Sequence, residues 1–591
     1  MAGTVKIGGA AGFWGDSSVG APQLVRVPGM RYIVFDYLAE LTMSILAGAR
    51  SKNRDLGYAT DFVDVVARQV LKACRERGIR LIANAGGVNP LACARALERL
   101  AAELGVPLKV AVVDGDDVLA LAPRLRERHT TDFYTGAAMP ERMLSANAYF
   151  GAVPIARALA LGADVVITGR VVDSAVTLGA LMHEFGWQPN DYDRLAAGSL
   201  AGHLIECGCQ ATGGLFTDWN EVPDWANIGY PVLECEADGS FVVTKPESTG
   251  GLVSVPALSE QLLYEIGDPA NYVLPDVVCD FTQVSMQGAG ENRVRVSGAR
   301  GKPPTTTYKV SGTYAEGFRA IGTLTITGFD AAAKAKRSGE AILERTRAIF
   351  RPLGIGDYSA VDLSVLGTAS VYGPHMQPPE LREAVMRLAV SHVDRKALEI
   401  FAREIAPAGT SWSPGTTGSL NAGRPNVAPQ VKQFAFLLSK TEAVPRVTIG
   451  DHSEEVPVEP GSDRALDPGA DEESSGALPA ADAETVPLMR IAHGRSGDKG
   501  DTSNVGILAR KPEYLPLIRS QVSAQSVRAF LAHLVKGNVR RYALPGIGAY
   551  NFVLEQALGG GGMASLRNDP LGKGMAQVLL AMPVRIPREL L

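Results

Sequence analysis

The sequence predicts an α/β protein with a mostly parallel sheet in its N-terminal region, a β-richer middle part and a small C-terminal α+β domain. Residues 4–185 alternate short apolar runs with longer helical patterns, as in a parallel sheet covered on both faces. Residues 205–330 carry short runs of alternating polarity between turn residues, which predicts antiparallel strands. The 591 residues exceed one hydrophobic core, so several domains are expected.

Five apolar runs of the N-terminal region end in polar or glycine-rich segments. These runs are 5–7, 32–35, 81–83, 110–113 and 165–167. Ligands of open α/β sheets bind at the carboxyl ends of the strands, so these segments are expected to meet in one crevice. A closed β/α barrel would gather them similarly, but the repeats are too few for eight strands. The sequence therefore favours an open sheet.

Three domain-scale segments follow from composition. The main body covers residues 1–450 and predicts helices over 331–349 and 379–401. Residues 451–487 are acidic and rich in Pro, Ser and Ala, which predicts a disordered linker. Residues 488–591 predict a compact α+β domain.

Composition also excludes classes of protein. The formal net charge is -5 and no basic tract is present, so no nucleic-acid partner is expected. The N-terminus lacks a signal-peptide pattern, and no run approaches the roughly 18 apolar residues of a membrane helix. The six cysteines are scattered, as in reduced proteins of the cytosol. We therefore expect a cytoplasmic protein with no membrane contact.

The loop Gly8–Asp16 follows a strand and precedes a helix, a context in which backbone N–H groups bind anions. Its spacing matches neither the dinucleotide-binding fingerprint nor the P-loop, so no redox cofactor is indicated. A plain tight turn and an anion-binding loop both remain open for this segment.

Candidate acid–base and amide groups follow the second and third strands. If a helix begins directly after Asp36, the i, i+4 spacing places Asp36 and Glu40 on one face, where they can exchange protons or hold a metal. Asp36 can instead be the N-cap of that helix. Asn84, Gly86 and Gly87 offer an amide and bare backbone at a strand end, which suits substrate contact.

Two further groups occur where strands give way to helices. Arg170, followed by Asp173 and Ser174, suits a clamp for carboxylate or phosphate, although Arg170 and Asp173 can also form a local salt bridge. His203 and Glu206, at i, i+3, can share a helix face for acid–base chemistry or supply half a metal site. A glycine-rich structural turn is the alternative for this second group.

Two polar cassettes of the C-terminal domain, 493–504 and 558–569, predict loops built around an anion such as a carboxylate or the phosphates of CoA. Their candidate binding residues are Arg495, Asp498, Lys499, Gly559, Gly560, Gly561, Gly562 and Arg567. The alternative is an interdomain salt-bridge network that docks this domain on the main body. Both interpretations hold if the pocket lies between the domains.

Long motifs carry a family resemblance. Phe35-Asp-Tyr-Leu-Ala-Glu40 and Leu263-Tyr-Glu-Ile-Gly-Asp-Pro269, with the segments at 8–16, 84–87, 167–175 and 203–214, resemble the AtuA family, the acyclic terpene utilisation proteins. Arg495-Ser-Gly-Asp-Lys-Gly-Asp501 and the glycines at 559–562 resemble the ferredoxin-fold-like domain that follows it. The resemblance covers about 5–450 and 488–588. It implies the breakdown of citronellol and geraniol, in which neighbouring steps act on branched acyl-CoA thioesters, and leaves the reaction open.

We interpret the inventory as a catabolic enzyme, a hydratase or hydro-lyase, for a branched or carboxylated organic acid or acyl-CoA. Asp36, Glu40, His203 and Glu206 are the candidates for proton transfer, and glycine N–H groups can stabilise an enolate. No cofactor is expected beyond a CoA-linked substrate, and a homo-oligomer is expected. The alternatives are a non-catalytic acyl-CoA-binding or assembly subunit, and a metal-dependent lyase.

Overall fold

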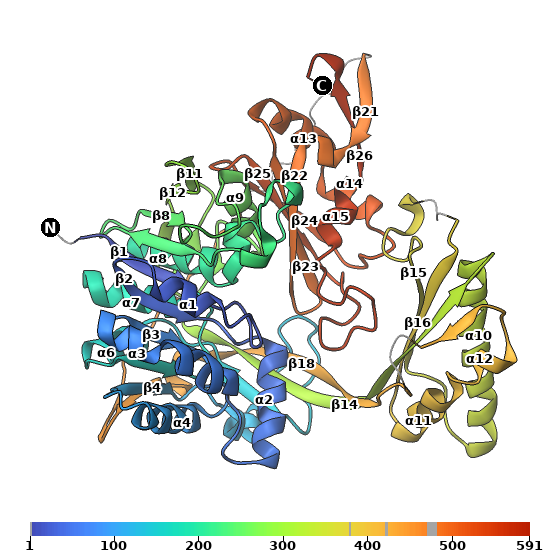
Figure 1. The fold of residues 1–591 in the computed structure, drawn as a ribbon, viewed down its shortest axis with the longest axis horizontal. Helices are drawn as coiled ribbons and strands as arrows, with labels where there is room; N and C mark the ends of the chain where they lie inside the picture. The colour runs from blue at the N-terminus through green and yellow to red at the C-terminus, as the bar shows by residue number, and fades with distance from the viewer. Residues whose placement is uncertain (1–2, 377–379, 420–422, 470–481, 591) are drawn as a thin grey trace.

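An eleven-stranded open sheet forms the main body of the computed structural model, which describes residues 3–376, 380–419, 423–469 and 482–590 (Figure 1). In spatial order its strands are β11 (Ser285–Gly288), β12 (Val294–Ser297), β8 (Phe241–Thr244), β7 (Val232–Cys235), β1 (Val5–Gly9), β2 (Met30–Phe35), β3 (Arg80–Ala83), β6 (Val165–Thr168), β4 (Val110–Asp114), β19 (Arg446–Ile449) and β20 (His452–Glu455). Across the described ranges, no helix has the length and apolar character needed to cross a membrane.

The centre of the sheet consists of the predicted strands β1, β2, β3, β6 and β4, which are parallel neighbours. Ile33 packs on one face, under α1 (Gly20–Val25), α3 (Arg68–Arg77) and α4 (Pro90–Glu103). Val34 packs on the other, under α6 (Val153–Ala160), α7 (Ala175–Phe185) and α8 (Tyr192–Ile205). Both faces are buried, which explains the continuous apolar runs and confirms the open sheet.

The β-richer middle part includes β14 (Thr307–Thr327), a strand of 21 residues that runs from the main body into a second lobe (Figure 1). Its first half pairs with β5 (Ser145–Ala148) and β18 (Ala428–Ser439), and its second half with β16 (Glu383–His392). Within the lobe, β15 (Ala360–Leu366) and β17 (Thr416–Gly418) extend the sheet, and α10 (Ala331–Phe350) and α11 (Arg395–Glu404) pack on it.

The helix predicted over 379–401 is wrong in its first part, because Glu383–His392 forms β16 and the helix α11 begins only at Arg395. The composition favours a helix, but Ala384, Met386 and Leu388 are buried at every second position. Pairing with β14 on one side and β15 on the other fixes this strand, so tertiary context overrides local propensity.

The C-terminal domain contains a four-stranded antiparallel sheet in the order β22 (Ala492–Lys499), β23 (Thr502–Ala509), β25 (Ala549–Leu554) and β24 (Val539–Leu544). Helices α13 (Leu515–Gln521), α14 (Ala524–Phe530) and α15 (Met575–Leu579) contribute to its core, which confirms the predicted α+β domain. The first polar cassette is a hairpin rather than a loop, because Lys499 pairs with Thr502 across the turn Gly500-Asp501.

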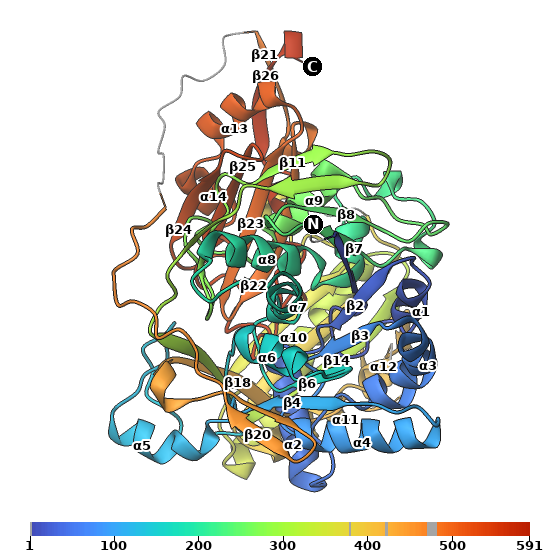
Figure 2. The same cartoon turned by 90° about the vertical axis from the view of Figure 1, so that its left-hand side faces the viewer.

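The first half of the predicted disordered linker, 451–487, packs on the main body. β20 pairs with β19, Val456 is buried in the core, and the N–H of Gly469 donates to the carboxylate of Asp268 at 2.7 Å. These partners compensate for a composition typical of disorder. Ala483–Pro487 forms β21, which pairs with β26 (Pro583–Pro587) and projects at the top of Figure 2. Residues 470–481 lie outside the described residues.

Candidate functional site

Polar side chains from three parallel strand ends meet as predicted, but Asp36 and Glu40 do not share a helix. α2 (Glu40–Lys52) begins at Glu40, after an extended segment that follows Asp36. Asp36 is buried and accepts a hydrogen bond from the amide of Asn84, whose oxygen accepts the Tyr37 N–H at 2.6 Å. Burial and the charge of Asp173 raise the pKa of Asp36 well above its usual range.

Arg170 forms the predicted local salt bridge and is also stacked on an aromatic ring. Its Nη1 lies 2.8 Å from Asp173, and its guanidinium lies 4.1 Å from the ring centre of Tyr149. Its backbone N–H donates to buried Asp116 at 2.9 Å. Arg170 is buried, and its Nε has no hydrogen-bond partner among the described residues. This charge therefore lies inside the cluster rather than on the surface.

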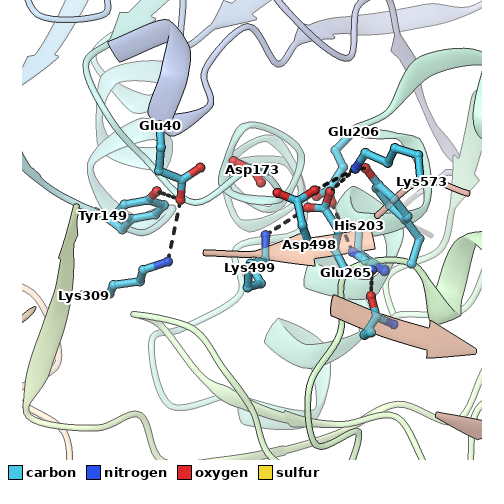
Figure 3. A network of polar contacts seen from close by, with 12 residues as sticks. Glu40, Tyr149, Asp173, His203, Glu206, Glu265, Lys309, Asp498, Lys499 and Lys573 are labelled. Atoms are coloured by element: carbon cyan, nitrogen blue, oxygen red, sulfur yellow. Dashed lines mark hydrogen bonds and ion pairs between the residues drawn. The ribbon is translucent and has the colours of Figure 1, made fainter. Parts of the chain in front are cut away.

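Glu40 is the anionic partner of two residues that the sequence did not indicate. The Tyr149 hydroxyl donates to Glu40 at 2.7 Å, and Lys309 of β14 lies 3.7 Å from the same carboxylate oxygen (Figure 3). Burial opposes ionisation of Glu40, but Lys309 and Lys499 outweigh it and lower its pKa to about 2. Glu40 is therefore ionised at neutral pH.

His203 and Glu206 form the contact that their spacing predicts, at the end of α8. Nδ1 of His203 lies 3.1 Å from Glu206, and Nε2 lies 3.2 Å from the carbonyl oxygen of Leu262. Both side chains are buried. Burial raises the pKa of Glu206, and the contact with Glu206 raises the pKa of His203 against the effect of burial. The pair can therefore hold a proton between its members.

The hairpin β22–β23 brings two ionisable side chains of the C-terminal domain to this cluster. Lys499 donates to Glu265 at 3.0 Å, and Lys573 donates to Glu265 at 2.9 Å and to Asp498 at 3.0 Å (Figure 3). Burial raises the pKa of Asp498 to about 6, although Lys573 opposes this rise. The lysines hold the pKa of Glu265 far below its usual range despite burial.

Lys499 connects the groups of the two domains. Its charge helps to lower the pKa of Glu40 in the main body. It also opposes the rise that burial causes in the pKa of Glu206 and of Asp498. Figure 3 shows it between the Glu40 group and the His203–Glu206 pair. The cluster is therefore electrostatically continuous across the domain boundary.

Two asparagines of the C-terminal sheet clamp the backbone that carries Glu265. Asn504 donates to Leu263 O at 2.6 Å and accepts the Glu265 N–H at 2.9 Å. Asn551 donates to the carbonyls of Ile266 and Gly267 at 2.9 and 2.7 Å. Glu265 has a φ of +57°, in the left-handed region that non-glycine residues rarely adopt. Domain docking therefore sets the position of Glu265.

Arg495 and its neighbours support the docking interpretation of the first cassette. Arg495 is buried, donates to Gln210 and to Leu215 O, and lies 4.7 Å from the ring centre of Tyr264. Asp218 of the main body also accepts two hydrogen bonds at 2.6 Å from Arg510 of the C-terminal domain. Arg495 therefore holds the two domains together, beside the cluster.

The second cassette differs from the predicted anion loop. The carboxylate of Asp501 accepts the N–H groups of Leu558 and Gly560 at 3.1 and 2.9 Å. Arg567 donates to the carbonyls of Leu534 and Ala557 at 3.1 and 2.5 Å. An internal carboxylate thus takes the place predicted for a ligand anion. Gly559–Gly562 and Arg567 stabilise their own loop.

The glycines at the third strand end have packing roles. The Gly86 N–H donates to Thr168 O at 3.1 Å, so it is engaged within the protein. A Cβ at Gly87, which has φ +53°, would lie 2.4 Å from Leu46. Ser174 is buried against Gly202, where an added Cβ would come within 2.7 Å of it. Helix and loop packing therefore accounts for these residues within the protein, and their contact with a substrate stays a prediction.

The loop Gly8–Asp16 closes as a tight turn. The Gly12 N–H donates to the Asp16 carboxylate at 2.9 Å, and Tyr230 donates to the same carboxylate at 2.9 Å. Over the described part of the chain, no three His, Cys, Asp or Glu side chains are grouped to hold a metal. Within that part of the chain, neither Asp36 and Glu40 nor His203 and Glu206 are joined by a third side chain of this kind.

Sequence reasoning missed Tyr149, Lys309, Glu265 and Lys573. Lys309 lies within a strand and Tyr149 just after one, where no local pattern marks them. The motif 263–269 contained Glu265, but its charge gave no indication of a partner 234 residues away. Contacts between distant elements decide these positions.

An open α/β body and an α+β domain that share one charged cluster define a two-domain α/β protein. The chain matches the acyclic terpene utilisation family protein AtuA over residues 5–449 and the AtuA ferredoxin-like domain over 486–585. It therefore belongs to the AtuA family, as the motifs predicted. No curated protein and no solved structure gives a significant match.

Proposed function

We propose that this protein is a lyase of the hydratase type, acting on a branched or carboxylated organic acid or its CoA thioester. The observation that supports the proposal is the position of Lys499. This cation of one domain lies among carboxyl groups of both domains and opposes the rise that burial causes in the pKa of Glu206 and of Asp498. The family's link to acyclic terpene utilisation supports a branched, catabolic substrate.

Addition of water to a double bond conjugated with a carbonyl needs a base, an acid and a group that stabilises the enolate. In the proposed reaction, Asp498, with a pKa of about 6, accepts the proton of water as the oxygen bonds to the β-carbon. Glu206, whose pKa is raised, delivers a proton to the α-carbon. Lys499 stabilises the negative charge on the enolate oxygen between these steps.

Glu40 has a different role in this proposal. With a pKa of about 2 it cannot release a proton near neutral pH, so it orients Lys309 and Tyr149 instead. Lys309 and Arg170 are then the cations closest to a substrate carboxylate on this side of the cluster. Different environments thus separate the carboxyl groups into proton-transfer and structural roles.

The test uses the purified full chain and a panel of branched enoic acids and their CoA thioesters. Turnover appears as a mass gain of one water, with oxygen from labelled solvent. Glu206→Gln and Asp498→Asn are each expected to lose about 10²-fold or more in kcat, as for removal of a general acid or base. Unchanged turnover in Glu206→Gln would remove this residue from the role.

Absence of turnover by the chain alone, with turnover only when another protein is added, would contradict the proposal. That outcome would favour a non-catalytic acyl-CoA-binding or assembly subunit. The matched control is Glu454→Gln, because Glu454 forms its ion pair with Arg157 at the edge of the main sheet, away from the cluster.

A further inference from the structure

An acidic loop with two tryptophans lies at the surface of the main body. This tryptophan loop, residues 215–227, has Asp218, Glu221 and Asp224 but no lysine or arginine. Trp219 and Trp225 are 61% and 59% exposed, and their rings stack edge to face at 5.9 Å. Exposed aromatic side chains gathered in this way mark interaction surfaces, and tryptophan is enriched at binding hot spots.

The backbone of the tryptophan loop is held in an unusual conformation. Leu215, which is 64% exposed, has φ +62°, and Asp224 has φ +46°. Left-handed conformations at non-glycine residues carry a cost that the surrounding structure must offset. The loop is also fixed at Asp218 by Arg510. The tryptophans are therefore presented on a rigid support.

A basic groove of about 680 Å³ lies next to this loop, on the C-terminal domain. Its lining residues are Pro487, Met489, Arg490, Arg510, Lys511, Tyr514 and Ile586, which include three cations and no carboxylate. Arg490 and Lys511 are exposed, and Met489 is 40% exposed. Pro487 of β21 and Ile586 of β26 belong to its lining, so the groove lies beside this pair of strands. The two strands project at the top of Figure 2.

The loop and the groove form one continuous patch. Arg510 lines the groove and binds Asp218, the residue directly before Trp219. The patch therefore has an acidic, aromatic half and a basic, hollow half side by side. Such a patch is complementary to itself when a second copy is turned by a two-fold rotation, as in isologous dimers.

We propose that this patch is a homodimer interface, in which the tryptophan loop of each protomer enters the basic groove of its partner. Glu221 and Asp224 then face Arg490 and Lys511 of the other copy, and the tryptophans pack on its apolar lining. Burial of four indole side chains would remove apolar surface on the order of 500 Å² from water. This proposal is independent of the proposed reaction.

The test is the mass of the full chain in solution, measured by sedimentation equilibrium. The wild type is expected to show twice the mass of one chain, and Trp219→Ala/Trp225→Ala the mass of one chain. Phe329→Ala is the matched control, because Phe329 is a 74% exposed aromatic residue on the other lobe. This variant should remain dimeric.

A charge exchange tests the pairing itself. Glu221→Lys/Asp224→Lys and Arg490→Glu/Lys511→Glu are each expected to be monomeric, since like charges then meet. Mixed in equal amounts, they should form a heterodimer, because both contacts regain opposite charges. This recovery would also show that each variant is folded. A monomeric wild type, or a mixture that stays monomeric, would overturn the proposal.

Discussion

Replacement of Asn504 by alanine tests whether domain docking positions the charged cluster. Asn504 makes three hydrogen bonds, to Leu263 O at 2.6 Å, from Glu265 N–H at 2.9 Å and to Asn551 at 2.9 Å. The change leaves two backbone groups of the clamped segment without partners. Each such group costs about 1–3 kcal/mol when buried, so we expect a loss of about 2–6 kcal/mol.

Without the clamp, Glu265 is free to leave its left-handed conformation and its lysine partners. Burial opposes the charge of Lys573, but Glu265 and Asp498 raise its pKa above the ordinary value. Loss of Glu265 therefore lowers this pKa. A lower pKa increases the fraction of free amine at a fixed pH below the pKa.

The assay is mass-spectrometric measurement of acylation rates at single lysines across a pH series. Lys573 is expected to react faster in Asn504→Ala than in the wild type, with exposed Lys536 as the internal reference. Asn538→Ala is the matched control, since Asn538 contacts only Glu555 of its own domain at 3.3 Å among the contacts described for its side chain. Equal Lys573 rates in wild type and Asn504→Ala would refute the reasoning.

Further changes test docking and proton transfer. Asp218→Asn should lower the free energy of unfolding at pH 7 by about 1–3 kcal/mol, since it breaks a partly buried ion pair. Arg510 lowers the pKa of Asp218 in the folded protein. The ion pair therefore stabilises the wild type above about pH 4, and this stabilisation is lost as pH falls through the lower folded-state pKa. Denaturant melts at several pH values should show the difference in unfolding free energy between the wild type and Asp218→Asn shrinking in acid. In Asp498→Asn, the rise of kcat/KM with pH near 6 should disappear from any residual activity. Gly497→Ala places a Cβ 2.5 Å from Cγ of Glu265 and should destabilise docking by about 1–3 kcal/mol in thermal melts.

The fold followed from patterns that are local in the sequence. The five apolar runs became parallel strands because each is buried on both faces. Residues 383–392 were wrongly predicted as helix, because their helix-like composition hid a pattern in which every second residue is buried. That pattern corresponds to a strand only because β14 and β15 pair with this segment on its two sides.

The sequence by itself determined the strand ends that gather Asp36, Asn84 and Arg170, and the contact between His203 and Glu206. These depend on parallel-strand geometry and on helix periodicity, both of which are local. Only the tertiary structure decided which charges meet. Lys309, on the long strand β14, lies close to Glu40. Lys499 contacts Glu265 across the domain boundary, although 234 positions separate the two residues in the sequence.

Tertiary packing also decided which polar groups form hydrogen bonds with partners inside the protein. Asp501 uses the N–H groups of the C-terminal glycine loop, and carbonyl groups hold Arg567. A sequence shows that a cation or a bare backbone is present, but not which internal partner satisfies it. Buried polar groups take the nearest partner that geometry allows, and that geometry exists only once the domains have docked.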